Sequence, residues 1–200
     1  MDAKTQKAEL TRAAIIGAAL DLAAAEGLES ITLQAVADRI GLSKSGVFSR
    51  VGSRETLQKA VIEEFGRRFL ADVFVPSMQL PKGLPRLESI VHRWIIRTRD
   101  VEARNGCIFT AGAFELDDRE GPLRDFLHQE ITRWRAALRR TVLQAIEAGH
   151  LKGDTDPEQF VSEIYAFTLG MIHDARFLRD NKAAERAQAT WRRLLATYTP

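Results

Sequence analysis

The stretch best suited to bind a charged partner is residues 43–50, which combines hydroxyl, basic and very small side chains. Between Arg39 and Arg54 there are four basic residues and no acidic one, although the first 55 residues hold seven of each. Lysine and arginine can neutralise phosphates, and small side chains let a helix backbone enter the major groove of DNA. The pattern therefore predicts a nucleic-acid contact. A solvated basic surface without a partner is the alternative.

The elements that must position this stretch are two short helices joined by a tight turn. The first is expected to start after Thr32 and to end at Gly41, and the second to start after Ser43 and run to about residue 50. Threonine and serine suit the N-cap positions because each hydroxyl can accept an unpaired backbone N–H. Ala37 is small where the helices would cross, Gly41 can take a left-handed turn, and Val47 can fill the angle between them. This spacing predicts a helix-turn-helix.

The rest of the chain is expected to be helical as well. Alanine, leucine, arginine and glutamate dominate, strand-like alternation is hard to find, and glycine or proline separates the apolar periodicities. Three prolines and a glycine at 76–85 predict a linker. The sequence thus predicts an all-α protein of about nine helices, at 5–25, 33–40, 44–50, 54–73, 86–103, 107–116, 122–148, 157–180 and 182–198.

Composition excludes several classes of protein. One cysteine in 200 residues rules out a disulfide framework within the chain, and 45% apolar residues are enough for a folded core. No apolar run approaches the ~18–20 residues that cross a bilayer, and the start of the chain lacks a secretory layout. We expect a soluble, cytoplasmic protein with no membrane partner. The net charge of +2 means that nucleic-acid binding must come from a local patch.

No enzyme chemistry is evident in the sequence. The four histidines have no metal-ligand spacing, and no phosphate-binding loop or nucleophile elbow is present. The acidic residues near Asp117 could form a hard-metal site, but they are expected to lie in a solvated loop between helices. Cys107 is expected to be a buried, inert thiol. We therefore expect no catalytic residue, no metal and no cofactor.

The first third of the chain resembles the DNA-binding domain of the tetracycline-repressor (TetR) family of bacterial transcriptional regulators. The resemblance covers residues 10–65 and rests on residues 31–44, ITLQAVADRIGLSK, and residues 52–57, GSRETL. It implies a helix-turn-helix domain at 1–53, a connecting helix at 54–75 and a ligand-binding and dimerisation domain at 76–200.

The resemblance also implies a role for each residue of the motif. The residues expected at phosphates are Thr32, Ser43, Lys44, Phe48 and Arg54, and those expected near base edges are Ser45, Gly46, Ser49 and Arg50. Phe48 stands where the family often has tyrosine, so a hydroxyl-to-phosphate bond is absent there. Arg50 stands where histidine is common, and it can reach either a guanine or a phosphate.

Aromatic side chains of the C-terminal region form a second candidate site. They lie on separate expected helices and can either converge on a cavity or form an ordinary core. The family typically encloses a small-molecule effector between its central helices. The residues assigned to this site are Trp94, Phe109, Phe114, Trp134, Phe167 and Met171.

The last two expected helices indicate a homodimer. The helix at 157–180 is apolar on two faces, and each face needs a cover. Two such helices from each of two chains would form a four-helix interface, as in the family's dimers; the alternative is that one chain covers both faces. The expected interface residues are Phe160, Ile164, Tyr165, Ile172, Trp191 and Leu195.

The expected function is that of a ligand-responsive repressor that binds a palindromic double-stranded DNA operator as a homodimer. An unknown small-molecule effector would release it by binding the conformation that does not bind DNA. Two alternatives remain: an all-α small-molecule-binding protein or enzyme whose N-terminal motif is only structural, and a DNA-binding protein without an effector.

Overall fold

The computed structural model describes the backbone of residues 3–200 and the side chains of residues 5–200. The chain forms two compact units. One contains the residues up to Arg67 together with Cys107–Gln129, and the other contains Arg68–Gly106 together with Glu130–Pro200. The segment 107–129, which is distant in sequence from the helix-turn-helix, thus belongs to the same unit as that motif. Among residues 3–200, no helix combines the length and hydropathy needed to span a bilayer.

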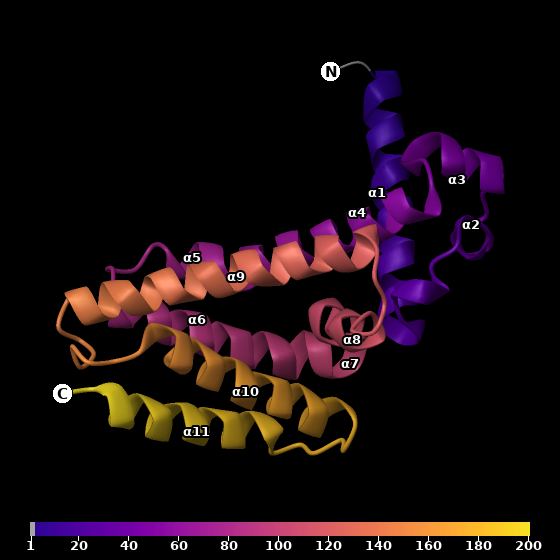
Figure 1. Cartoon of the computed structure of the whole chain (residues 1–200). Helices are drawn as coiled ribbons and strands as arrows, with labels where there is room; N and C mark the ends of the chain where they lie inside the picture. The colour runs from indigo at the N-terminus through magenta and orange to yellow at the C-terminus, as the bar shows by residue number, and fades with distance from the viewer. Residues whose placement is uncertain (1–2) are drawn as a thin grey trace. The chain divides into compact units, whose positions relative to one another are not determined.

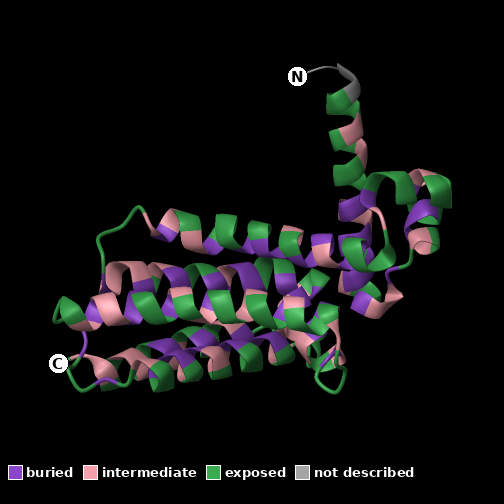
Figure 2. Cartoon of the chain, turned by 45° about the horizontal axis from the view of Figure 1, so that its top comes forward, coloured by how far each residue is buried: buried purple, intermediate pink, exposed green. Residues whose placement is uncertain are grey.

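The first unit is built around the N-terminal helices (Figure 1). The buried residues of α1 begin at Ile15, whereas residues 5–14 are mostly exposed, as the green start of this helix in Figure 2 shows. The fully buried side chains of Leu28, Val36 and Leu57 join α1 in this core. The elements of this unit are α1 (Ala3–Glu26), the short 3-10 turn η1 (Leu28–Ser30), α2 (Leu33–Ile40), α3 (Lys44–Val51), most of α4 (Arg54–Phe69), α8 (Ile108–Glu115) and the start of α9 (Pro122–Glu147).

The second unit contains the long C-terminal helices, with α10 packed along α11 (Figure 1). Phe160 is fully buried and stacks on the rings of Tyr198 and Trp191, at centroid distances of 4.3 and 6.0 Å. The elements are η2 (Leu70–Phe74), α5 (Val75–Ser77), α6 (Leu84–Arg97), η3 (Thr98–Glu102), α7 (Ala103–Asn105), the remainder of α9, α10 (Pro157–Arg176) and α11 (Ala183–Tyr198).

A hydrogen bond ties the end of α11 to α10. The Tyr198 hydroxyl donates to a carboxylate oxygen of Glu163 at 2.8 Å. Burial of the phenol, together with this bond to an anion, raises the pKa of Tyr198 to about 12. The phenol therefore keeps its proton, and the bond, throughout the physiological pH range.

The prediction of an all-α protein with about nine helices is confirmed. The described residues contain no strand, and they form nine helices when each helix is followed through its π turns. The π turns are η2, which joins α4 to α5, and η3, which joins α6 to α7. They were not predicted, because a π turn adds one residue to a helical turn without a distinct sequence signal.

The linker expected at 76–85 is shorter in the structure. Pro76 lies in α5 and Pro85 lies in the first turn of α6, so only residues 78–83 are outside helices. Proline is tolerated in the first turn of a helix because the N–H that it lacks has no partner there. The helix expected at 157–180 ends at Arg176, just before Arg179 adopts a left-handed conformation with φ 55°.

Candidate DNA-binding surface

The turn between α2 and α3 has the geometry predicted from sequence. Ala37 and Val47 are fully buried, where the two helices pack against each other. Gly41 is left-handed, with φ 68°, and its N–H donates to the Ala37 carbonyl. A side chain at Gly41 would be strained in this conformation. The close crossing and the left-handed turn together define a helix-turn-helix.

Both predicted N-caps are present. The Thr32 hydroxyl accepts the N–H of Ala35 at 3.0 Å, and the Ser43 hydroxyl accepts the N–H of Gly46 at 3.0 Å. A Cβ at Gly46 would lie 3.1 Å from the Ser43 hydroxyl oxygen, so a larger residue there would crowd the cap. These caps fix where α2 and α3 begin, and their positive N-terminal ends are suited to phosphate oxygens.

The outer face of α3 is polar, basic and exposed. Val47 and Val51 are buried in the core, whereas Phe48, a large apolar residue, is 57% exposed. The serine hydroxyls have local partners as well: Ser49 donates to the Gly46 carbonyl at 2.9 Å, and Ser45 shares a 3.1 Å bond with Ser43. The predicted contact residues that this face exposes are Lys44, Ser45, Phe48, Ser49 and Arg50.

Leu42 is a candidate that sequence reasoning missed. It directly precedes the Ser43 cap and is 39% exposed, although it is a large apolar residue in the turn of the motif. An exposed leucine beside a basic face can pack on the sugar-phosphate backbone or on a thymine methyl group. The only signal in the sequence was an apolar residue immediately after the glycine of the turn.

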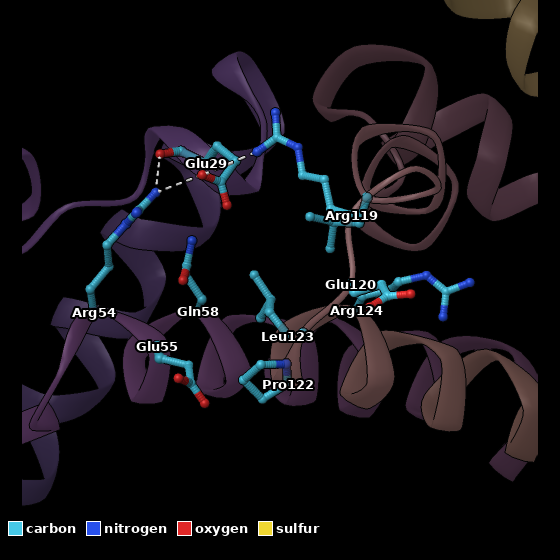
Figure 3. Close-up of a pocket in the computed structure, with 11 residues that line it drawn as sticks. Glu29, Arg54, Glu55, Gln58, Arg119, Glu120, Pro122, Leu123 and Arg124 are labelled. Carbon is cyan, nitrogen blue, oxygen red and sulfur yellow. Dashed lines mark hydrogen bonds and ion pairs between the residues drawn. The ribbon is translucent and has the colours of Figure 1, made fainter.

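Arg54, predicted as a phosphate contact, bonds to the first unit although its side chain is 45% exposed. Its Nε donates to the Ile31 carbonyl at 2.7 Å, and one Nη donates to the Glu29 carbonyl at 2.6 Å. The same Nη lies 3.2 Å from the Glu29 carboxylate, which also lies 3.4 Å from Arg119 (Figure 3). These groups line a cavity of about 330 Å³. Arg54 therefore fixes the start of α4 against the segment before α2.

Glu115, at the end of α8, binds the N–H groups of the same segment. Its two carboxylate oxygens accept the N–H groups of Leu28 and Glu29 at 2.8 and 2.7 Å. Gly27 makes room for this: it has φ 91°, and a Cβ there would lie 2.9 Å from a Glu115 oxygen. The acidic group near Asp117 that is expected to face water includes Glu115, and for Glu115 this expectation is wrong. No local pattern reveals a bond to residues 86 and 87 positions away.

The described residues contain no cluster of three or more histidine, cysteine or acidic side chains able to hold a metal ion. Cys107 is buried, as its sequence context suggested.

The aromatic residues predicted to bind a ligand are divided between the two units. In the first unit, Phe109 packs edge-to-face on Phe65 at 5.1 Å, and Phe114 is 70% exposed, so Phe114 is not enclosed. The second unit contains the other four. Trp94 and Trp134 pack on each other at 5.5 Å, Phe167 lies 6.4 Å from Trp191, and Met171 is buried in the same core.

The residues predicted for a dimer interface are mostly covered by their own chain. Four of them, Phe160, Ile164, Ile172 and Trp191, are at most 7% exposed within the single chain, in which α11 packs on both α10 and α6. Their side chains are therefore not available to a partner, and the single-chain alternative holds for them. Tyr165 and Leu195 are only partly buried. The sequence showed that α10 is apolar on two faces but did not show which helices cover them.

This fold and surface define an all-α, helix-turn-helix DNA-binding regulator, and comparison with known families makes the assignment specific. Residues 15–61 match the family model of bacterial regulatory proteins, tetR family. Residues 83–191 match the model of the tetracyclin repressor-like C-terminal domain. The chain belongs to the TetR family of transcriptional regulators, which is not a family of enzymes. This excludes the alternative in which the N-terminal motif is only structural.

Solved structures share the fold across the chain. A TetR-family regulator from Cytophaga hutchinsonii has a TM-score of 0.81 at 18% identity and covers 96% of both chains. One from Streptomyces coelicolor has a TM-score of 0.80 at 16% identity and covers 100% of this chain and 97% of its own. AibR, solved with isovaleryl coenzyme A and operator DNA, has a TM-score of 0.71 at 17% identity and covers 94% and 98%. No curated protein matches the sequence.

Proposed function

We propose that the chain is a cytoplasmic repressor that binds a palindromic operator as a homodimer and releases it when a small-molecule effector binds. The observation that supports this most strongly is the exposed basic face of α3 on a well-packed helix-turn-helix. Lys44 and Phe48 would lie at phosphates, and Ser45, Ser49 and Arg50 would lie at or near base edges. The N-terminal end of α2 at Thr32 would bind a further phosphate.

The test is fluorescence-anisotropy titration of the purified protein with DNA from upstream of its own gene. A scrambled duplex of the same composition is the control, and both are titrated at several salt concentrations. We expect sequence-selective binding about 1000-fold tighter than to the scrambled duplex, with an affinity that falls steeply with salt. If the upstream DNA binds weakly, selection from a random DNA library replaces it. Weak, unselective binding in both experiments would exclude the proposed function.

The proposed dimer contact is the exposed face of α10 rather than its buried stripe. Leu169 is 37% exposed on this face, between the small residues Ala166 and Gly170, and Phe177 at the end of the helix is 76% exposed. Small residues allow two helices to approach closely, and a two-fold axis would place each copy of Leu169 against the same face of the partner. A dimer also supplies the second recognition helix that a palindrome requires.

Replacing Leu169 with glutamate is expected to weaken dimerisation by at least about 100-fold, because the two-fold axis buries the new charge twice. Sedimentation equilibrium measures the dissociation constant. Leu80→Glu, at a leucine that is 40% exposed outside α10, is the matched control and is expected to leave it unchanged. Equal dimer dissociation constants for Leu169→Glu and Leu80→Glu would exclude this face of α10 as the interface.

Release by an effector requires a coupling between the two units. The helices α4 and α9 each contribute residues to both units, so a change at one end of either helix is covalently linked to the other. The effector must bind the DNA-free conformation more tightly, and the operator must then weaken effector binding by the same factor. AibR, a relative of the same fold, has been solved with both a small molecule and operator DNA.

A further inference from the structure

Two buried indole N–H groups in the second unit have no hydrogen-bond acceptor. Trp94 on α6 and Trp134 on α9 are 6% and 4% exposed, and neither Nε1 donates a hydrogen bond to a described residue. The third tryptophan, Trp191, is equally buried at 6%, but its Nε1 is not among the enclosed, unpartnered atoms. Among the three tryptophans, only Trp94 and Trp134 therefore combine an enclosed indole nitrogen with the lack of a hydrogen-bond partner in the part of the chain that the structure describes.

Unpartnered donors at this depth are unusual. Buried polar groups almost always have a partner, and a buried group without one destabilises the fold. An indole nitrogen can only donate, so the missing partner must be an acceptor. The two rings pack edge-to-face with centroids 5.5 Å apart, so both donors belong to one small region of the unit.

The surroundings of the two indoles are aromatic. Phe69 packs edge-to-face on both, with its ring centroid 5.6 Å from Trp94 and 4.9 Å from Trp134. Tyr165 lies 5.3 Å from Trp94, and Phe74 lies 6.1 Å from Trp134. Tyr165 and Phe74 are only partly buried, so the aromatic cluster reaches the surface at these two rings. A ligand of the indoles would enter at this point of the unit.

The charged groups around this cluster disfavour an anion. The Arg97 guanidinium lies 5.6 Å from the Phe69 ring centroid, but it is already paired with two carboxylates, those of Asp72 and Glu102. Glu102 is fully buried and also accepts the Thr98 hydroxyl at 3.1 Å. The Arg135 guanidinium lies over the outer ring, 4.4 Å from the Tyr165 centroid. Two carboxylates thus already balance the two guanidinium groups near the cluster, and a bound carboxylate would add a third negative charge.

We infer that the effector is an uncharged, largely apolar molecule bearing a carbonyl group, such as a ketone, ester or lactone, whose oxygen accepts the indole N–H groups of Trp94 and Trp134. This inference rests on the effector site of the proposed function and assigns its ligand class and its two donors. A carbonyl oxygen has two lone pairs and accepts from either indole or from both. The aromatic rings provide the apolar contact, and the donors provide the specificity.

The test uses matched probes in which only the acceptor changes. Cyclohexanone, acetophenone and benzophenone are each compared with the hydrocarbon in which a methylene group replaces the carbonyl oxygen. Each is also compared with a carboxylate that carries the same ring or rings. Affinities are measured by isothermal titration calorimetry without DNA. For the size that fits, we expect the ketone to bind about tenfold more tightly than its hydrocarbon partner, which is the effect of one buried hydrogen bond. The carboxylate is expected to bind more weakly than the ketone.

The indole N–H proton resonances of isotope-labelled protein report the contact directly. The three tryptophans give three signals, which the single Trp→Phe variants assign. We expect a bound ketone to move the Trp94 or Trp134 signal, or both, downfield, as a new hydrogen bond requires, and to leave the Trp191 signal in place. The hydrocarbon is expected to produce no such downfield shift. This measurement uses the unaltered protein and does not depend on the folding of any variant.

The variants Trp94→Phe and Trp134→Phe each remove one donor and keep an aromatic ring. In one or both, the ratio of ketone to hydrocarbon affinity is expected to fall toward one, whereas the control Trp191→Phe keeps the ratio of the unaltered protein. Because all three variants lose similar ring volume, the ratio separates the N–H from packing. A ratio that survives both substitutions, or hydrocarbons that match the ketones at every size, would overturn the inference.

Operator binding is measured separately on the same preparations. If no ketone binds but the protein still selects its operator, the inference fails and the regulator remains. If a ketone binds through the indoles without weakening operator binding, the ligand class stands, and the effector part of the proposed function fails.

Discussion

Replacing Lys44 and Arg50 together with alanine is expected to weaken operator binding by about 100-fold or more. Each basic side chain that contacts a phosphate or a guanine contributes about 1–3 kcal/mol. Both residues lie on the exposed face of α3, away from the buried Val47. Their removal is therefore expected to change the free energy of unfolding by less than about 0.5 kcal/mol. Anisotropy titration measures the affinity, and chemical denaturation measures the stability.

The matched control for this pair is Lys82→Ala with Arg192→Ala. These residues are exposed basic side chains of the second unit, and their replacement changes the net charge by the same amount. A long-range field would respond equally to both pairs, whereas a local contact responds only to Lys44 and Arg50. The α3 double variant is also expected to release about one or two fewer ions on binding DNA, which lowers the slope of log affinity against log salt concentration by about that number. Equal loss in the two double variants would contradict a recognition role for α3.

Replacing Glu115 with alanine is expected to destabilise the first unit by about 3 kcal/mol. The substitution removes both acceptors of the Leu28 and Glu29 N–H groups, and hydrogen bonds to a charged acceptor contribute about 1.5–3 kcal/mol each. Because both bonds are only part-buried, we take each at the lower end of its range, which gives about 3 kcal/mol for the two. Amide hydrogen exchange at Leu28 and Glu29 is the direct measurement, because it reports on this segment alone.

Glu120→Ala is the control for this prediction. Glu120 lies five residues further along and lines the same cavity as Glu29, but it is exposed, and its substitution changes the net charge equally. Glu120→Ala is expected to change the free energy of unfolding by no more than about 0.5 kcal/mol. Glu115→Gln, which keeps an acceptor oxygen but loses the charge, is expected to fall between the two. If Glu115→Ala and Glu120→Ala have the same stability and exchange rates, the carboxylate does not hold the segment.

The recognition motif could be predicted from sequence because every feature of it is local. Thr32 and Ser43 cap helices by accepting N–H groups three residues away. The turn needs only the left-handed backbone conformation of Gly41. Ala37 and Val47 are ten residues apart, and both are buried where α2 and α3 pack together across a short turn. Interactions over such spacings follow directly from helix and turn geometry.

Arg54 shows what a local pattern does not contain. The phosphate contact implied by its place in the motif stays a prediction, and the structure adds that its guanidinium donates to carbonyl groups of Glu29 and Ile31. Both acceptors are backbone atoms more than twenty residues earlier, and backbone atoms carry no residue-type signal. The bonds from Glu115 could not be predicted for the same reason, because their donors are backbone N–H groups.

The sequence by itself determined the helical class, the number of helices, the helix-turn-helix and the residues exposed on its recognition face. Tertiary structure alone decided which helices cover the two apolar faces of α10, and that Phe160 and Trp191 pack within the chain rather than against a partner. It alone left the Trp94 and Trp134 indoles without acceptors. The physical reason is that periodicity shows which face of a helix avoids water, whereas the neighbour that covers it depends on packing between segments far apart in the chain.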